Sequence, residues 1–163
     1  MPKIELSPRC EACAALCCVL SSFSASPDFA IDKAAGRPCP YLQPDCRCAI
    51  YAARAIRGFG GCLSYDCYGA GQRLTEAWRD DPERGGLDER IQLFSAVTTV
   101  HELAWLLLGA SRLCPPALAE LRVELQRAHQ RLSDLELPAI RQLDLEAERT
   151  EAHALLRRLG AAL

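Results

Sequence analysis

Residues 10–18 read CEACAALCC, so four cysteines fall within one short stretch, at positions 10, 13, 17 and 18. Five more cysteines follow by residue 67, whereas the remainder of the 163-residue chain contains only Cys114. Thiolates bind soft and borderline metal ions, and clustered cysteines in a reducing compartment more often bind metal or carry redox chemistry than form structural disulfides. The pattern predicts a cysteine-cluster metal-binding module over residues 4–72.

Local signals place the cysteines of CEACAALCC on a helix. Ser7 is a suitable N-cap and Pro8 suits the first helical position, so we expect one helix over residues 8–20. At 100° per residue, its four thiols would occupy an arc of about 140°. Residues 21–43 lack periodicity and are expected to be irregular, whereas residues 48–57 are expected to form a second short helix. Because such a small unit buries little apolar area, we expect metal or disulfide bonds to stabilise it.

Three helical segments are predicted in the second half of the chain. Apolar residues at three- and four-residue spacing indicate a first helix over residues 88–113, which Pro115 and Pro116 end. The apolar seam of the second helix consists of Leu118, Leu121, Leu125, Ala128 and Leu132. The seam of the third helix consists of Ile140, Leu143, Ala147, Ala154, Leu155 and Leu159. We expect an antiparallel three-helix bundle over residues 88–160. The predicted fold class is mainly α, with the irregular cysteine-rich metal-binding module packed on this bundle.

Charge and targeting signals predict a cytoplasmic protein. The net charge is −2 and the chain has no concentrated basic segment, so nucleic acid is not expected as a partner. The first residues lack the apolar core of a secretory signal. The longest apolar stretch, residues 93–113, is interrupted by polar residues that include His101 and Glu102, so we expect a buried helix and no membrane span.

The cysteine pattern resembles that of the YkgJ-like proteins, which are described as zinc- or iron-chelating domains. The residues that carry this resemblance are CEACAALCC, Cys39-Pro40-Tyr41-Leu42 and Cys48-Ala49-Ile50-Tyr51. A closer resemblance, over residues 10–72, is to the cysteine-rich region ahead of pentapeptide repeats in some bacterial proteins. It rests on FAIDK at 29–33, GRPCP at 36–40, RGF at 57–59, GC at 61–62 and YDCYGAGQ at 65–72. The sequence carries no run of Ala-Asp-Leu-x-x pentapeptides, so no function of a repeat solenoid is expected.

The resemblance implies eight metal ligands. By position in the pattern they are Cys10, Cys13, Cys17, Cys18, Cys39, Cys48, Cys62 and Cys67. Cys46 falls where the family pattern has another residue, and Cys114 lies outside the pattern. Eight thiols suit two four-ligand sites, or one site with spare thiols.

An iron–sulfur cluster (4Fe–4S) and zinc are the two cofactors considered. Four thiolates leave a net charge of about −2 with either, and five arginines are close enough in sequence to offset it: Arg9, Arg37, Arg47, Arg54 and Arg57. Eight cysteines exceed the needs of one structural zinc, and the adjacent Cys17 and Cys18 cannot easily aim at one ion from a helix. Both observations slightly favour the cluster. All three histidines lie outside the cysteine segment, which disfavours a Cys/His zinc finger.

The predicted function is metal binding with a structural role and a further redox- or metal-sensing role. No catalytic residue is predicted, because His101-Glu102 is followed by Trp105 where a zinc protease needs histidine. No organic-cofactor site is predicted, because Gly69-Ala70-Gly71 lacks the third glycine and the preceding strand of a dinucleotide-binding fingerprint. His101 is interpreted as a core or interface histidine. Two other classes stay open: a protein-modifying enzyme related to the iron–sulfur lysine methylases that the resemblance includes, and a zinc-stabilised module whose helical bundle binds a protein partner. A thiol-based heavy-metal scavenger is a further alternative.

Overall fold

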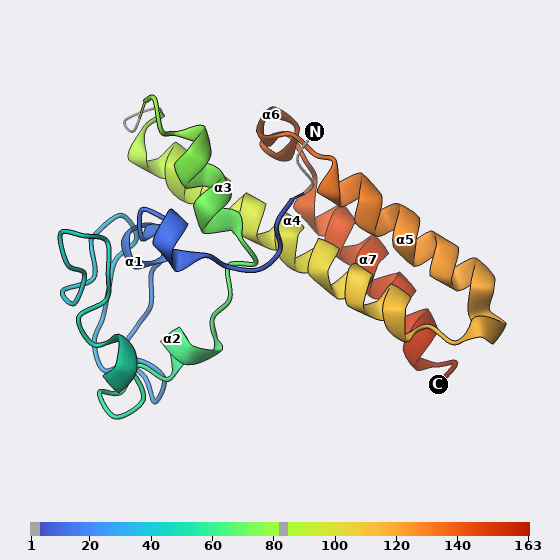
Figure 1. Ribbon diagram of the computed structural model, residues 1–163, viewed down its shortest axis with the longest axis horizontal. Coiled ribbons are helices and arrows are strands. Elements are labelled where there is room, and N and C mark those ends of the chain that lie inside the picture. The colour runs from blue at the N-terminus through green and yellow to red at the C-terminus, as the bar shows by residue number, and fades with distance from the viewer. Residues whose placement is uncertain (1–3, 82–84) are drawn as a thin grey trace. The chain divides into compact units, whose positions relative to one another are not determined.

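The computed structural model describes residues 4–81 and 85–163, and it divides into two compact units. The N-terminal unit covers Ser7–Phe94, and the C-terminal unit covers Ser95–Leu163 together with residues 4–6. The described residues form seven α-helices and three 3-10 helices (Figure 1), and β-structure among them is limited to isolated bridges. The predicted mainly α class is confirmed.

Three long helices dominate the second half of the chain, as the periodicity predicted. Helix α4 spans Leu87–Leu113 and starts one residue before its predicted start. The prolines after α4 cannot continue it, and the 3-10 turn η3 (Pro116–Leu118) leads into α5 (Ala119–Ser133). Helix α7 (Leu145–Gly160) completes the set and packs on α5. Four of the five expected seam residues of α5 are buried: Leu121, Leu125, Ala128 and Leu132.

Polar contacts inside the C-terminal unit connect these helices, which run alongside one another in Figure 1. The Nδ1 atom of His129 on α5 lies 2.9 Å from the carbonyl oxygen of Ala104 on α4. Arg149 on α7 donates a hydrogen bond of 3.0 Å to the Thr99 hydroxyl on α4. Because both bonds are partly or fully shielded from water, they fix the register of α5 and α7 against α4.

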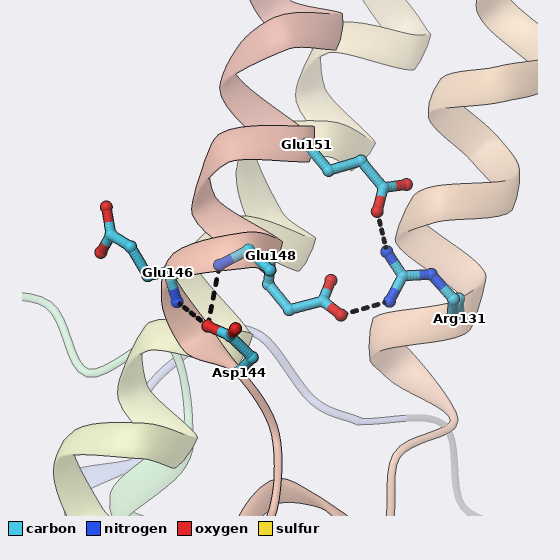
Figure 2. A network of polar contacts seen from close by, with 6 residues as sticks. Arg131, Asp144, Glu146, Glu148 and Glu151 are labelled. Atoms are coloured by element: carbon cyan, nitrogen blue, oxygen red, sulfur yellow. Dashed lines mark hydrogen bonds and ion pairs between the residues drawn. The ribbon is translucent and has the colours of Figure 1, made fainter.

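The third predicted helix is broken in two. Helix α6 covers Leu137–Ile140, and α7 begins only after Asp144, whose carboxylate accepts hydrogen bonds from the backbone N–H groups of Glu146 (3.1 Å) and Ala147 (3.0 Å). Figure 2 shows this cap, with Arg131 of α5 bonded to two glutamates of α7 nearby. The apolar spacing continues across the break, which is why periodicity alone concealed the N-cap.

Asp144→Ala is expected to lower the stability of the C-terminal unit by about 1 kcal/mol, because two backbone N–H groups lose their acceptor. Asp144→Asn keeps an oxygen at the N-cap and is the matched control. Thermal unfolding followed by circular dichroism measures the difference as a lower Tm for the alanine variant. Equal Tm values for the two variants would contradict the assigned cap.

The CEACAALCC segment does not form the single helix expected over residues 8–20. A 3-10 turn η1 (Cys10–Ala12) is followed by an extended Cys13, with φ −119° and ψ 136°. A left-handed Ala15, with φ 54°, then precedes the short helix α1 (Leu16–Leu20). The four cysteines therefore do not share one helix face.

Tertiary hydrogen bonding explains this break. The Ala14 N–H donates to the Thr75 hydroxyl at 3.0 Å, and Thr75 lies on α3 (Ala70–Ala77). In a continuous helix, that N–H would bond to a carbonyl four residues earlier. The high helix propensity of Ala and Leu in this segment is overridden by a partner that is distant in sequence.

The remaining N-terminal unit is held by aromatic packing more than by secondary structure. Residues 21–43 are irregular, as expected, but the helix expected over residues 48–57 is reduced to the 3-10 turn η2 (Tyr51–Ala53). Helix α2 (Gly61–Ser64) is only one residue longer than η2. The rings of Phe23 and Phe29 stack at a centroid distance of 4.2 Å, and Phe59 meets Phe23 edge-on at 6.4 Å. These rings fasten the irregular loop to the segment around η2 and α2.

Helix α4 also meets the length and hydropathy criteria of a membrane span. However, 56% of its most apolar 18-residue stretch is buried inside the protein, which is the pattern of a core helix. The cytoplasmic localisation stays a prediction.

Candidate metal centre

A cavity of about 830 Å³ lies within the N-terminal unit, and cysteines are the most frequent residues in its lining. The nine that line it are Cys10, Cys13, Cys17, Cys18, Cys39, Cys46, Cys48, Cys62 and Cys67. All eight predicted ligands are among them. The fold therefore brings together thiols that come from η1, α1, the irregular loop, α2 and the turn before α3.

The thiols are neighbours but do not converge on one point. All ten cysteines are free, and no three Cys, His, Asp or Glu side chains of residues 4–81 and 85–163 form a group that would hold a metal ion as they stand. The donor set itself is all sulfur, which suits zinc and iron–sulfur clusters and not hard cations. The ligand set stays a prediction. The structure shows which of these cysteines are neighbours.

Four of the cysteines, which we call group A, lie in segments that pack against α3 or directly precede it: Cys10, Cys13, Cys17 and Cys67. The position that a Cβ atom on Gly71 would occupy lies 2.7 Å from the Cys13 sulfur and 3.7 Å from the Cys67 sulfur. Glycine at this point of α3 is thus required by the close approach of two sulfurs. Both η1 and α1 pack against α3.

The pKa shifts in group A report the same proximity. Burial, followed by the charges of Cys67 and Cys13, raises the pKa of the Cys10 thiol. The pKa of Cys17 is raised first by its hydrogen bond with Cys18 and by burial, then by the charges of Cys18, Cys13 and Cys67. Burial raises the pKa of Cys13, while hydrogen bonds from the Leu16 N–H and the Thr75 hydroxyl act in the opposite direction. Neighbouring thiolates repel one another, so a cation bound between them would stabilise their ionised form.

The other four thiols, which we call group B, are tied together through the backbone: Cys18, Cys39, Cys48 and Cys62. The Cys39 N–H donates to the Cys18 carbonyl at 2.9 Å. Leu42 donates to the Cys39 carbonyl at 2.9 Å and pairs with Cys48 in an antiparallel bridge. Arg54 donates to the Cys62 carbonyl at 2.8 Å, which holds Cys62 against the turn at η2.

Group B has its own electrostatic environment. Burial, followed by the charges of Cys18, Cys39 and Cys48, raises the pKa of Cys62. Burial likewise raises the pKa of Cys39, with Cys18 and Cys48 adding to the shift. The pKa of Cys18 is lowered to about 7 by a hydrogen bond from Cys17, and the charges of Lys33 and Arg54 act in the same direction. Of the five arginines expected to offset the thiolate charge, Arg54 is thus placed beside group B.

Lys33 is a buried cation in the cysteine-rich unit that the sequence analysis missed. It is only 6% exposed, and its Nζ donates to the carbonyls of Val19 (3.1 Å), Ser21 and Ala34 (3.3 Å) around the end of α1. Burial lowers the pKa of Lys33, whereas the neighbouring Cys39 and Cys18 raise it. The sequence does contain a signal for Lys33: only two of the 19 basic residues are lysines, and one of them lies in the cysteine segment.

Gln72 is a second missed residue, and it positions the segment that carries Cys10. Its side-chain oxygen accepts the Arg9 N–H at 2.8 Å, and its nitrogen donates to the Ser7 carbonyl at 2.9 Å. The side chain is 8% exposed and satisfies both backbone groups as a neighbouring strand would. Together with Thr75, Gln72 fastens the segment before α1 onto α3.

The cysteines outside the predicted set lie in different settings. Cys46 is exposed in a turn and has a positive φ of 62°. Cys114 is buried in the C-terminal unit, and its thiol donates to the Leu118 carbonyl at 3.5 Å, at the connection between α4 and α5. His101 is also buried there, 1% exposed, in agreement with a core histidine. Gly69 adopts the left-handed conformation, φ 82°, and opens α3.

Comparison with known proteins finds one distant relative. No family model matches the chain, and no solved structure does. The chain is 32% identical over 160 residues to the uncharacterized protein YybG of Bacillus subtilis (strain 168), an alignment that covers 93% of this chain and 56% of YybG. The chain thus spans about half the length of that relative. The similarity extends through both units, while the relative's name assigns no activity to either.

Proposed function

We propose that the protein binds metal through the thiols that line the cavity of the N-terminal unit. The observation that carries this proposal is the gathering of the eight predicted ligands, all free thiols, around one cavity. The cations Lys33 and Arg54 beside them offset part of the negative charge of a thiolate complex. The resemblance to the YkgJ-like cysteine-cluster proteins supports the same function.

An iron–sulfur cluster (4Fe–4S) is slightly favoured over zinc, since eight thiols exceed one structural zinc. When bound, either cofactor would neutralise thiolate charge and cross-link segments that share little regular structure. The site is proposed to be structural, with a further role in sensing redox state or metal level. A cytoplasmic location belongs to this proposal, because a reducing compartment keeps the thiols available.

The C-terminal unit is proposed to be an antiparallel three-helix bundle of α4 from Ser95 onward, α5 and α7. Its apolar seams and its polar contacts between helices support this arrangement. A bundle of this kind folds without metal, because its core is built from aliphatic side chains.

Removal of the metal is expected to unfold the N-terminal unit and to leave the helices of the C-terminal unit largely intact. The protein is purified without oxygen or added metal, and its zinc, iron and acid-labile sulfide are measured together with an absorption spectrum. A broad band near ~400 nm would indicate an iron–sulfur cluster. A chelator is then added, and limited proteolysis with circular dichroism follows each unit.

Two results would overturn the proposed function. One is protein that contains neither iron nor zinc and gains none when supplied with them. The other is unchanged protease resistance of residues 7–81 after full metal removal.

One observation favours a protein-interaction module as a second candidate. The large apolar side chains of Trp105 on α4 and Val123 on α5 are 49% and 41% exposed. Under this alternative, zinc only maintains the fold and a protein partner binds the bundle. The protein-modifying enzyme is the third candidate, since a cavity of about 830 Å³ falls within the range of ligand pockets.

A further inference from the structure

We infer that the eight cysteines form two separate four-thiol metal sites, group A and group B, which divide between the adjacent residues Cys17 and Cys18. The inference rests on the proposed metal-binding function and deepens it. It assigns each thiol to one site, which the cysteine pattern alone left open.

Group A is defined by its position on α3. The backbone reverses at the extended Cys13 and the left-handed Ala15, and this turns the Cys13 thiol onto the helix at Gly71. Cys67 immediately precedes α3, and its sulfur lies within 4 Å of the same Gly71 position. The bonds from Gln72 to Ser7 and Arg9 hold the segment of Cys10 against the same helix. Group A is therefore assembled on one side of α3.

Group B is assembled without α3. Its members are linked by backbone hydrogen bonds that run from Cys18 to Cys39, and from Cys39 through Leu42 to Cys48. The Arg54 side chain then links Cys62 to the turn η2, because it donates to the carbonyls of both Cys62 and Tyr51, each at 2.8 Å. These contacts involve the irregular loop, η2 and α2.

The division falls at Cys17 and Cys18 because consecutive residues of a helix are rotated by about 100°. Both residues lie in α1, so their side chains leave the helix in different directions. Lys33 closes the end of α1 with hydrogen bonds to the carbonyls of Val19 and Ser21. Glu11, of opposite charge, lies beside Cys10 of group A.

The two sites are adjacent, because Cys17 and Cys18 are consecutive residues of α1 and their thiols are hydrogen-bonded to each other.

A protection experiment on the intact chain tests the inference. Metal-free protein is titrated with zinc and treated with N-ethylmaleimide, and the modified cysteines are identified by peptide mass spectrometry. Two zinc ions are expected per chain. At low zinc, protection is expected to appear in complete sets of four, with Cys17 protected in the set of Cys13 and Cys67, and Cys18 in the set of Cys39 and Cys62.

Substitutions extend the test. In Cys13→Ser the expected protected set is group B alone, and in Cys39→Ser it is group A alone, while Cys46→Ser retains both. Because a serine variant can fail to fold, the wild-type protection pattern decides. Protection of mixed sets, or of Cys17 and Cys18 always together at substoichiometric zinc, would overturn the division. No protection at any zinc concentration, in protein that also holds no metal as purified, would instead contradict the proposed function.

Discussion

Gly71→Ala is expected to abolish metal binding by group A while group B remains loaded. The added Cβ would lie 2.7 Å from the Cys13 sulfur, a separation that folded proteins do not accommodate without movement. Cys13 cannot easily retreat, because the neighbouring Ala14 N–H is bonded to Thr75 on the same helix. Overpacking of this kind costs about 1–3 kcal/mol.

The sign of the stability change makes this result diagnostic. Alanine in a helix interior is otherwise favoured over glycine by about 1 kcal/mol. Gly109→Ala is the matched control, since Gly109 lies inside α4 and a Cβ there meets no atom within 4 Å. Metal analysis and thermal unfolding are measured for both variants. A Gly71→Ala protein with full metal content and a raised Tm, like the control, would show that the close approach of Cys13 has no role.

Lys33→Met is expected to destabilise the N-terminal unit by about 2–4 kcal/mol, because the ammonium group hydrogen-bonds three backbone carbonyls at a buried position. Loss of its charge is also expected to weaken metal retention by group B, whose Cys18 and Cys39 it faces. Lys33→Arg is not expected to rescue either property, since a planar guanidinium does not replace a compact ammonium among three carbonyls.

Urea unfolding and the metal content per chain measure these effects. Arg79→Met is the matched control, because it removes one positive charge at an exposed position of the same unit, away from the cysteine cavity. A Lys33→Met variant as stable as this control, with unchanged metal retention, would refute the role assigned to Lys33.

Helix α4 was predictable from the sequence, whereas the site was predictable only as a list of residue types. The apolar spacing of Val97, Val100 and Leu107 located α4 to within one residue, because a helix buried along its length leaves a periodic signal. Periodicity did not reveal the cap at Asp144, since the apolar pattern continues on both sides of the break.

The local structure of CEACAALCC was predicted wrongly for a physical reason. Its composition favours a helix, but the atoms that redirect the chain lie on α3, at Thr75 and Gly71. Lys33 and Gln72 were missed for the same reason. Both hydrogen-bond partners of Gln72, and two of the three partners of Lys33, lie 12 or more residues away in the sequence. Cysteine spacing predicts which thiols are available, and only tertiary contacts predict how they are grouped.

The attachment of the first segment to α3 also determines the order of events during synthesis. The bonds from Arg9 and Ser7 to Gln72 close a loop of more than 60 residues, and the bond from Ala14 to Thr75 closes one of similar length. Closing such loops is entropically unfavourable and requires that both ends be present. A nascent chain therefore exposes the thiols of CEACAALCC from the moment they leave the ribosome until α3 has emerged. During that interval their protection depends on the reducing capacity of the surroundings and not on the fold.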